Sequence, residues 1–222
     1  MKKWTHEEMA TKMNMIHNMD CLEFMKQVPD DYFDLVLTDP PYGIDLANMN
    51  MGIGNTPKAS KKENRKWESK DWDKSAPSNE VFDEIFRISK NQIIWGGNYF
   101  DLPPFKYYIL WDKQIPKGLS FADCEMAWTS YDKAPKMFRY SAYRNKSEKV
   151  HPTQKPPELF RYCIEVSKVE ENSKIFDPFM GSGTTALACK SLGGIDWCGC
   201  ELEQDYVAIA NKRLEKVQGS LF

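Results

Sequence analysis

Short apolar segments and amphipathic segments alternate along the 222 residues of this chain. Segments apolar enough to form buried strands lie at residues 13–18, 33–38, 92–95, 107–111, 125–130, 175–177 and 196–200. Apolar residues recur at helical spacing in residues 20–28, 78–90, 157–168 and 204–217. Because strands and helices alternate, the pattern predicts an α/β fold with a mostly parallel sheet.

In two regions the apolar residues follow neither helical nor strand spacing. Residues 43–77 hold several glycines and a proline, followed by a basic run, which predicts a long mobile loop. Residues 112–150 are also basic and irregular. The segments at 107–111 and 125–130 are expected to pair as a hairpin at the sheet edge. We therefore expect one domain over residues 1–222 that carries two irregular regions.

Composition narrows the class of protein. Hydrophobic residues make up 41% of the chain and aromatic residues 13%, which is enough for the core of one domain with a small insertion. The apolar runs are far too short to span a membrane, and the N-terminal lysines precede no signal-peptide core. The six cysteines lack the spacing of a disulfide scaffold, and Cys198 and Cys200 fit a buried strand better than a metal site. We expect a cytoplasmic protein with no membrane contact and no metal.

The most informative segment follows a short buried strand and reads Thr-Asp-Pro-Pro-Tyr at residues 38–42. Pro40 and Pro41 fix φ and offer no N–H, so their carbonyl groups remain available as acceptors for a ligand. Asp39 adds a carboxylate acceptor, and the ring of Tyr42 adds a flat face. This combination predicts a clamp for a planar group that carries an amine.

A second segment, at residues 174–185, combines a strand, an acid and a Gly-Ser-Gly turn before a helix of small residues. Gly181 and Gly183 allow a ligand to approach the backbone, and the start of the helix presents free N–H groups. Glu201 ends the next apolar strand, where an acid suits the two hydroxyl groups of a ribose. A phosphate-binding loop is excluded, because no Gly-Lys-Ser/Thr follows the glycines.

Together these motifs resemble those of the S-adenosylmethionine-dependent amino-methyltransferases of DNA. Asp-Pro-Pro-Tyr at 39–42 precedes Asp-Pro-Phe-Met-Gly-Ser-Gly-Thr-Thr at 177–185, an order that resembles the permuted (beta) group of N6-adenine and N4-cytosine enzymes. A third match is His-Pro-Thr-Gln-Lys-Pro-Pro at 151–157. The resemblance spans residues 14–213. It implies a class I, Rossmann-like fold: a seven-stranded, mostly parallel sheet with helices on both faces, one antiparallel strand near an edge, and a small target-recognition insertion at 112–150.

The resemblance also implies roles for individual residues. Asp39 and the carbonyl of Pro40, next to Pro41, would each accept one N–H of the target amine. Tyr42 would stack on a base that has flipped out of the duplex. The residues that would contact S-adenosylmethionine are Asp20 and Cys21 at its adenine, Glu201 at its ribose, Thr153 and Lys155 at its carboxylate, Asp177 at its amino group, and Phe179, Gly181, Ser182, Gly183 and Thr184 around its methionine part.

Charge gives a local rather than a global argument for nucleic-acid binding. The net charge is −2, but basic residues cluster at 58–70 and at 133–149, where aromatic residues lie among them. Such mixtures can contact phosphates and stack on bases. A solvated charged loop is the alternative for either cluster read alone. The candidates for DNA contact are Lys61, Lys62, Arg65, Lys136, Arg139, Tyr143 and Arg144.

The segment Asp-Pro-Pro-Tyr at residues 39–42 is called the tetrapeptide from here on. The expected activity is methyl transfer to N6 of adenine in double-stranded DNA, because Asp at the first position of this tetrapeptide is typical of the adenine enzymes. Methylation of N4 of cytosine, methylation of an RNA or protein amide, and an inactive DNA-binding subunit remain alternatives. Plainer roles also remain for Lys155, as a surface lysine, and for Asp20, as a helix N-cap. The resemblance further allows a homodimer and a restriction endonuclease partner.

Overall fold

The computed structural model describes residues 2–43, 75–116, 122–142, 144 and 154–217. Most of the expected loop at 43–77 lies outside the described residues. The same is true of five candidate residues: Lys61, Lys62, Arg65, Tyr143 and Thr153. Within the described ranges, no helix combines the length and the apolar character needed to cross a membrane.

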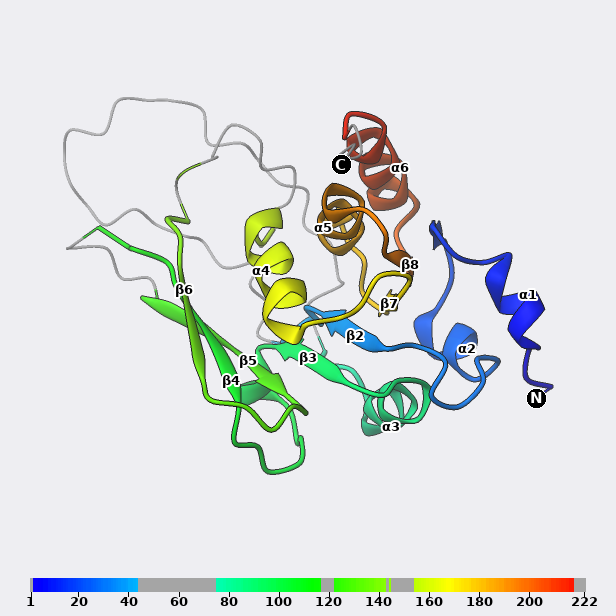
Figure 1. The fold of residues 1–222 in the computed structure, drawn as a ribbon, viewed down its shortest axis with the longest axis horizontal. Coiled ribbons are helices and arrows are strands. Elements are labelled where there is room, and N and C mark those ends of the chain that lie inside the picture. The colour runs from blue at the N-terminus through cyan, green and yellow to red at the C-terminus, as the bar shows by residue number, and fades with distance from the viewer. Residues whose placement is uncertain (1, 44–74, 117–121, 143, 145–153, 218–222) are drawn as a thin grey trace.

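A mixed sheet of eight strands forms the centre of the described structure, in the order β1-β8-β7-β2-β3-β5-β4-β6 (Figure 1). The strands are β1 (Met15–His17), β2 (Leu35–Thr38), β3 (Gln92–Trp95), β4 (Tyr108–Asp112), β5 (Cys124–Thr129), β6 (Lys136–Arg139), β7 (Lys174–Asp177) and β8 (Asp196–Cys200). β5 runs antiparallel to both of its neighbours, and every other neighbouring pair is parallel. The predicted α/β class and the single antiparallel strand near an edge are confirmed.

The expected count of seven strands is wrong, because the described residues form eight. Residues Lys136–Arg139 form β6, which pairs in parallel with β4 and occupies the sheet edge. The expected antiparallel pair of β4 and β5 is present, but β6 separates it from that edge. The sequence pattern misses β6 because three of its four residues are exposed and only Phe138 packs against the core. Charged side chains are typical of edge strands, where they discourage pairing with other chains.

Helices cover both faces of the sheet (Figure 1). They are α1 (His6–Ala10), α2 (Cys21–Met25) and α3 (Asn79–Ile88) on one face, and α4 (Pro157–Ser167), α5 (Thr184–Leu192) and α6 (Gln204–Glu215) on the other. Alternation along β2 shows the two layers: Leu35 and Leu37 pack with α4 and α5, whereas Val36 packs with α2 and α3. Because both faces are covered, the central strands carry consecutive apolar residues that point to both faces.

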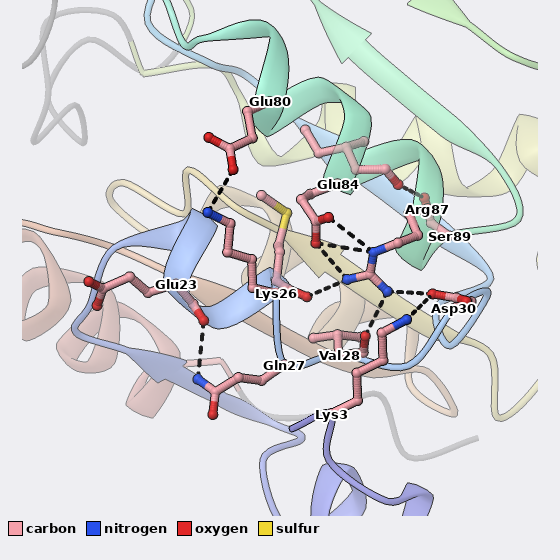
Figure 2. A network of polar contacts seen from close by, with 12 residues as sticks. Lys3, Glu23, Lys26, Gln27, Val28, Asp30, Glu80, Glu84, Arg87 and Ser89 are labelled. Atoms are coloured by element: carbon pink, nitrogen blue, oxygen red, sulfur yellow. Dashed lines mark hydrogen bonds and ion pairs between the residues drawn. The ribbon is translucent and has the colours of Figure 1, made fainter. Parts of the chain in front are cut away.

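Arg87, near the end of α3, fastens this helix to the end of α2 (Figure 2). Its guanidinium donates to the carbonyl oxygens of Met25 and Val28 at 2.7 and 2.8 Å. Glu84 and Asp30 flank the same guanidinium, each with an N–O distance of 2.5 Å. A cation is favourable at the C-terminal end of a helix, where carbonyl oxygens lack partners. The network therefore holds α2 and α3 together on one face of the sheet.

Candidate active site

The carboxyl ends of β2, β7 and β8 lie together at one edge of the sheet, because these strands are parallel neighbours. A cavity of about 410 Å³ opens there. The predicted site residues that line it are Asp20, Cys21, Asp39, Pro41, Lys155, Asp177, Phe179, Gly181, Ser182, Thr184 and Glu201. The tetrapeptide and the glycine turn therefore share one cleft, where open α/β sheets commonly bind ligands.

Glu201 directly follows β8, and two backbone N–H groups hold its carboxylate. The N–H of Gly181 donates to Oε2 and the N–H of Glu203 donates to Oε1, both at 2.8 Å. Burial raises the pKa of Glu201, and the two N–H groups oppose that rise. Gly181 has φ of +53°, and a Cβ built there would meet no atom nearer than 3.9 Å. Glycine at 181 thus satisfies the backbone and leaves open space beside it.

Gly183 and Ser182 serve packing beside the cavity. Gly183 has φ of +85°, and a Cβ built there would lie 2.9 Å from Cβ of Ala210 on α6. The side chain of Arg213, also on α6, donates to the hydroxyl of Ser182 at 2.9 Å. Gly183 does not itself line the cavity. Its role in the structure is to let α6 pack against the start of α5.

Asp177 is buried, and its carboxylate is committed to bonds inside the protein. Oδ1 accepts from the hydroxyl of Thr38 at 2.7 Å and from the N–H of Phe179 at 3.0 Å, while Oδ2 accepts from the hydroxyl of Thr185. Burial raises the pKa of Asp177 to about 6. The carboxylate therefore ties β2, β7 and α5 together, and any contact with a ligand would share these oxygens.

Asp20 caps the N-terminus of α2. Its Oδ1 accepts from the N–H groups of Leu22 and Glu23 at 2.8 and 3.1 Å. Asp20 also lines the cavity, as does the neighbouring Cys21. The plainer role of helix N-cap and a place beside a ligand are therefore compatible at this residue.

Asp39 lies beside Lys155 and Tyr42. Nζ of Lys155 and the hydroxyl of Tyr42 both donate to Oδ1 of Asp39, the hydroxyl at 2.8 Å. Among the described residues, none donates a hydrogen bond to Oδ2 of Asp39 or to the carbonyl of Pro40. Burial raises the pKa of Asp39, and the ammonium of Lys155 opposes that rise. Asp39 thus lines the cavity with one oxygen that no described residue engages, whereas Pro40, which is buried, and Tyr42 do not line the cavity.

Lys155 is a buried ammonium, with 5% of its side chain exposed, rather than a surface lysine. In addition to Asp39, its Nζ lies 2.9 Å from the hydroxyl of Tyr42 and 3.2 Å from Oε2 of Glu125. Burial by itself would lower the pKa of Lys155, but the carboxylates of Asp39 and Glu125 outweigh burial and raise it well above its usual range. Its ammonium therefore contacts the tetrapeptide, although the residue was expected at a cofactor carboxylate.

Glu125, on β5, is a member of this cluster that sequence reasoning misses. Its Oε1 lies 2.6 Å from Nζ of Lys113, which follows β4. Burial by itself would raise the pKa of Glu125, but Lys155 and Lys113 lower it to about 2. The available sequence signal is an acid at the start of an otherwise apolar strand.

The ring of Tyr42 stacks on the ring of Tyr99, with centroids 4.7 Å apart and planes 13° apart. Gly96 makes room for this ring: it has φ of +68°, and a Cβ built there would lie 2.2 Å from Cε1 of Tyr42. Tyr99 is 48% exposed. The flat face next to Asp39 is therefore a pair of aromatic rings, of which the sequence motif indicates one.

The described candidates for DNA contact lie at different ends of β6. Arg139 is at its carboxyl end, 3.6 Å from the carboxylate of Asp112. Arg144 lies over the ring of Tyr140, 5.4 Å from its centroid. Lys136 begins the strand. β6 runs in the same direction as β2, so its carboxyl end lies on the same side of the sheet as the carboxyl ends that form the cavity. The two arginines therefore lie on the side of the cavity, and Lys136 lies at the opposite end of the strand.

Comparison with known proteins assigns this fold and site to a family. A family model of N6/N4 methyltransferases, described as DNA methylases, matches residues 58–212, well over half of the chain. This chain belongs to that family, and it is a DNA methyltransferase of the N6-adenine/N4-cytosine type, as its motifs predict.

Individual relatives agree with this assignment. The type II methyltransferase M.HinfI of Haemophilus influenzae is 26% identical over 258 residues, which cover 93% of this chain and 69% of that protein. The crystal structure of the M1.HpyAVI–SAM complex is similar with a TM-score of 0.54 and 23% identity, over 90% of this chain and 98% of that one. The cytosine-N4-specific PvuII DNA methyltransferase gives a TM-score of 0.57 and 16% identity, over 95% and 91% of the two chains. Both solved structures share the fold of this chain.

Proposed function

We propose that this DNA methyltransferase transfers a methyl group from S-adenosylmethionine to N6 of an adenine that has flipped out of double-stranded DNA. The observation that carries the proposal lies in the tetrapeptide. Oδ2 of Asp39 accepts no hydrogen bond from the described residues, and Asp39 lines the cavity that the glycine turn also lines. The carbonyl oxygen of the next residue, Pro40, also accepts none from the described residues, so the pair can supply the two acceptors that suit the two N–H donors of an exocyclic amine.

The cavity suits S-adenosylmethionine in size and chemistry. Its volume of about 410 Å³ is typical of small-molecule sites. The carboxylate of Glu201, oriented by two backbone N–H groups, can accept from the hydroxyl groups of a ribose. Gly181 leaves space for close approach of the methionine part. When bound, this cofactor supplies a methyl group that its sulfonium has already activated.

The tetrapeptide can make the amine a better nucleophile. The nitrogen lone pair of a nucleobase amine is delocalised into the ring, so the amine attacks poorly. When Oδ2 of Asp39 accepts one N–H and the carbonyl of Pro40 accepts the other, the lone pair becomes localised on the nitrogen. The nitrogen gains positive charge as it attacks, so a fixed carboxylate stabilises the transition state more than the ground state.

Positioning supplies much of the remaining rate. Tyr42 and Lys155 both hold Oδ1 of Asp39, which limits rotation of the carboxylate. Tyr42 and Tyr99 stack on each other next to Asp39, and the half-exposed ring of Tyr99 offers aromatic surface for a base. Flipping the base costs about a few kcal/mol of stacking and pairing.

Adenine is proposed as the target because the tetrapeptide begins with Asp39, whereas N4-cytosine enzymes more often have Ser at this position. Cytosine N4 is the second candidate, because the chain is similar in fold to a cytosine-N4-specific enzyme. Target recognition is proposed to involve residues 112–150 and 43–77, with Arg139 and Arg144 on the side of the cavity.

The test is transfer of a tritiated methyl group from S-adenosylmethionine to mixed-sequence duplex DNA, followed by nucleoside analysis. Label in N6-methyl-2′-deoxyadenosine supports the proposal, and label in N4-methyl-2′-deoxycytidine supports the second candidate. Label that appears only with RNA or protein, or no transfer by a folded protein that binds the cofactor, overturns both.

A further inference from the structure

Four ionisable side chains form a line of alternating charge that ends at the tetrapeptide. Lys113 contacts Oε1 of Glu125 at 2.6 Å, and Oε2 of Glu125 lies 3.2 Å from Nζ of Lys155. Nζ of Lys155 in turn donates to Oδ1 of Asp39. The four side chains are between 5% and 25% exposed, so solvent screens these charges incompletely.

Glu125 uses a separate oxygen for each lysine. Lys155 therefore has a second carboxylate partner in addition to Asp39. Lys155 and Tyr42 both donate to Oδ1 of Asp39, whereas Oδ2 has no donor among the described residues. The orientation of Asp39 therefore depends on Lys155, whose position depends on Glu125.

The sign of the charges gives Glu125 a second effect. A lysine beside Asp39 opposes the reaction, because it weakens the negative field in which the target amine becomes positive. Glu125 offsets the charge of Lys155, so Asp39 acts on the amine with less opposition. Without the carboxylate of Glu125, Lys155 would keep Asp39 as its one acidic partner among the described residues, and Lys113 would lose its partner.

We propose that Glu125, braced by Lys113, is a positioning residue for methyl transfer. It holds Lys155 in place and offsets the positive charge of this lysine, so that Asp39 presents one oriented, charged oxygen to the target amine. This role rests on the proposed function of Asp39. Glu125 does not line the cavity; it acts through its contact with Lys155 and through its charge. Its two lysine partners come from the residue after β4 and from the segment before α4.

A pH profile distinguishes this role from a purely structural one. The ionisable groups around Asp39 are Tyr42 from its own loop, Lys155, Glu125 and, behind it, Asp177. Methyl transfer requires ionised Asp39, so the rate falls as pH drops through the pKa of Asp39. The charge of Glu125 raises that pKa. Its removal should therefore shift the acid limb of the profile to lower pH.

The experiment compares Glu125→Gln with the whole wild-type chain in single-turnover methyl transfer to DNA across the acid range. We expect the rate at neutral pH to fall about tenfold and the acid limb to move down by on the order of half a unit to one unit. Lys113→Met removes a positive charge instead and should move the limb upward. Glu165→Gln is the matched control, because Glu165 pairs with Arg161 on the solvent face of α4 and should leave rate and limb unchanged.

The possible results of this experiment separate the role of Glu125 from the proposed function of the protein. An acid limb that stays in place in folded Glu125→Gln, with or without a slower rate, overturns the proposal. Should Glu125→Gln fail to fold, an unshifted or lowered limb in Lys113→Met overturns it as well. A wild-type protein that binds S-adenosylmethionine but methylates no DNA refutes the proposed function itself, which is a different result.

Discussion

The hydroxyl of Thr38 donates to Oδ1 of Asp177 at 2.7 Å, although the two residues are 139 positions apart in the chain. Thr38 immediately precedes Asp39 in the tetrapeptide, and Asp177 leads into the glycine turn. Both side chains are buried. One hydrogen bond thus sets the distance between the loop proposed to hold the base and the loop proposed to hold the cofactor.

Replacement of Asp177 by Asn should change how stability depends on pH. Burial raises the pKa of Asp177 from 3.8 to about 6. The folded protein therefore binds this proton more tightly than the unfolded chain, so the stabilisation is complete below pH about 4 and is lost as pH rises through about 6. The effect is on the order of 2–3 kcal/mol.

Urea unfolding of wild type and Asp177→Asn at several pH values between 4 and 7 measures this effect. The free energy of unfolding of the variant, minus that of wild type, should increase as pH rises. A difference that is constant with pH would show that the carboxylate does not titrate in this range.

Asp39→Asn should abolish most of the activity and leave cofactor binding almost unchanged. The amide keeps an oxygen for Tyr42 and Lys155, but it loses the negative charge and can present a donor where the target amine needs an acceptor. We expect the rate of methyl transfer to fall about 10²- to 10³-fold. Titration with S-adenosylmethionine checks binding, and a large loss of affinity would contradict the separate roles of the two loops.

Gly96→Ala should impair methyl transfer through Tyr42. The new Cβ would lie 2.2 Å from Cε1 of Tyr42, and φ of +68° disfavours alanine by about 1 kcal/mol or more. The control is Gly194→Ala, which has a similar φ of +62° but meets the flexible side chain of Glu171. Both variants should be destabilised, and only Gly96→Ala should lose activity. Equal activities would mean that the position of Tyr42 is unimportant.

Arg87→Met should destabilise the fold by about 2 kcal/mol, because it leaves two carbonyl oxygens and a partly buried Glu84 without their donor. Urea unfolding measures the change. Arg161→Met is the comparison: its pair with Glu165 is exposed, so we expect less than about 1 kcal/mol. Similar losses in both variants would argue against the network of Figure 2.

The double variant Arg139→Gln, Arg144→Gln should bind DNA more weakly and with a flatter salt dependence. If both side chains contact phosphates, the slope of log K against log salt should decrease by about 2. Lys136→Gln is the matched control, because Lys136 begins β6 at the end away from the cavity. The measurement is DNA binding at a series of salt concentrations. A double variant that keeps the wild-type slope would show that Arg139 and Arg144 do not contact phosphates.

The sequence predicts the parts of the fold and site that depend on local pattern. Buried strands such as β2 and β7 have apolar centres, and the segments after them contain prolines and glycines whose backbone properties can be read directly. Parallel neighbours then bring Asp39 and Gly181 to one edge. This is why the shared cleft can be anticipated without coordinates.

Contacts between distant charged side chains could not be predicted in the same way. Lys155 and Glu125 each look like an ordinary charged residue, and only the register of β4 with β5 and the packing of α4 bring them together. β6 escapes prediction for a related reason, since an exposed edge strand needs no alternation of apolar residues. Tyr99 could not be predicted either, because its ring meets that of Tyr42 only after the chain has folded.

The pairing of β1 with β8 has a consequence for biosynthesis. The ribosome makes β1 first and β8 last among these strands, so β1 has no partner among the described strands until residue 200 has been translated. Such long-range pairing is slow to form, and an unpaired strand is prone to aggregation in the meantime. Glu201 emerges directly behind β8, so a nascent polypeptide lacks part of the cavity wall until this residue has been made.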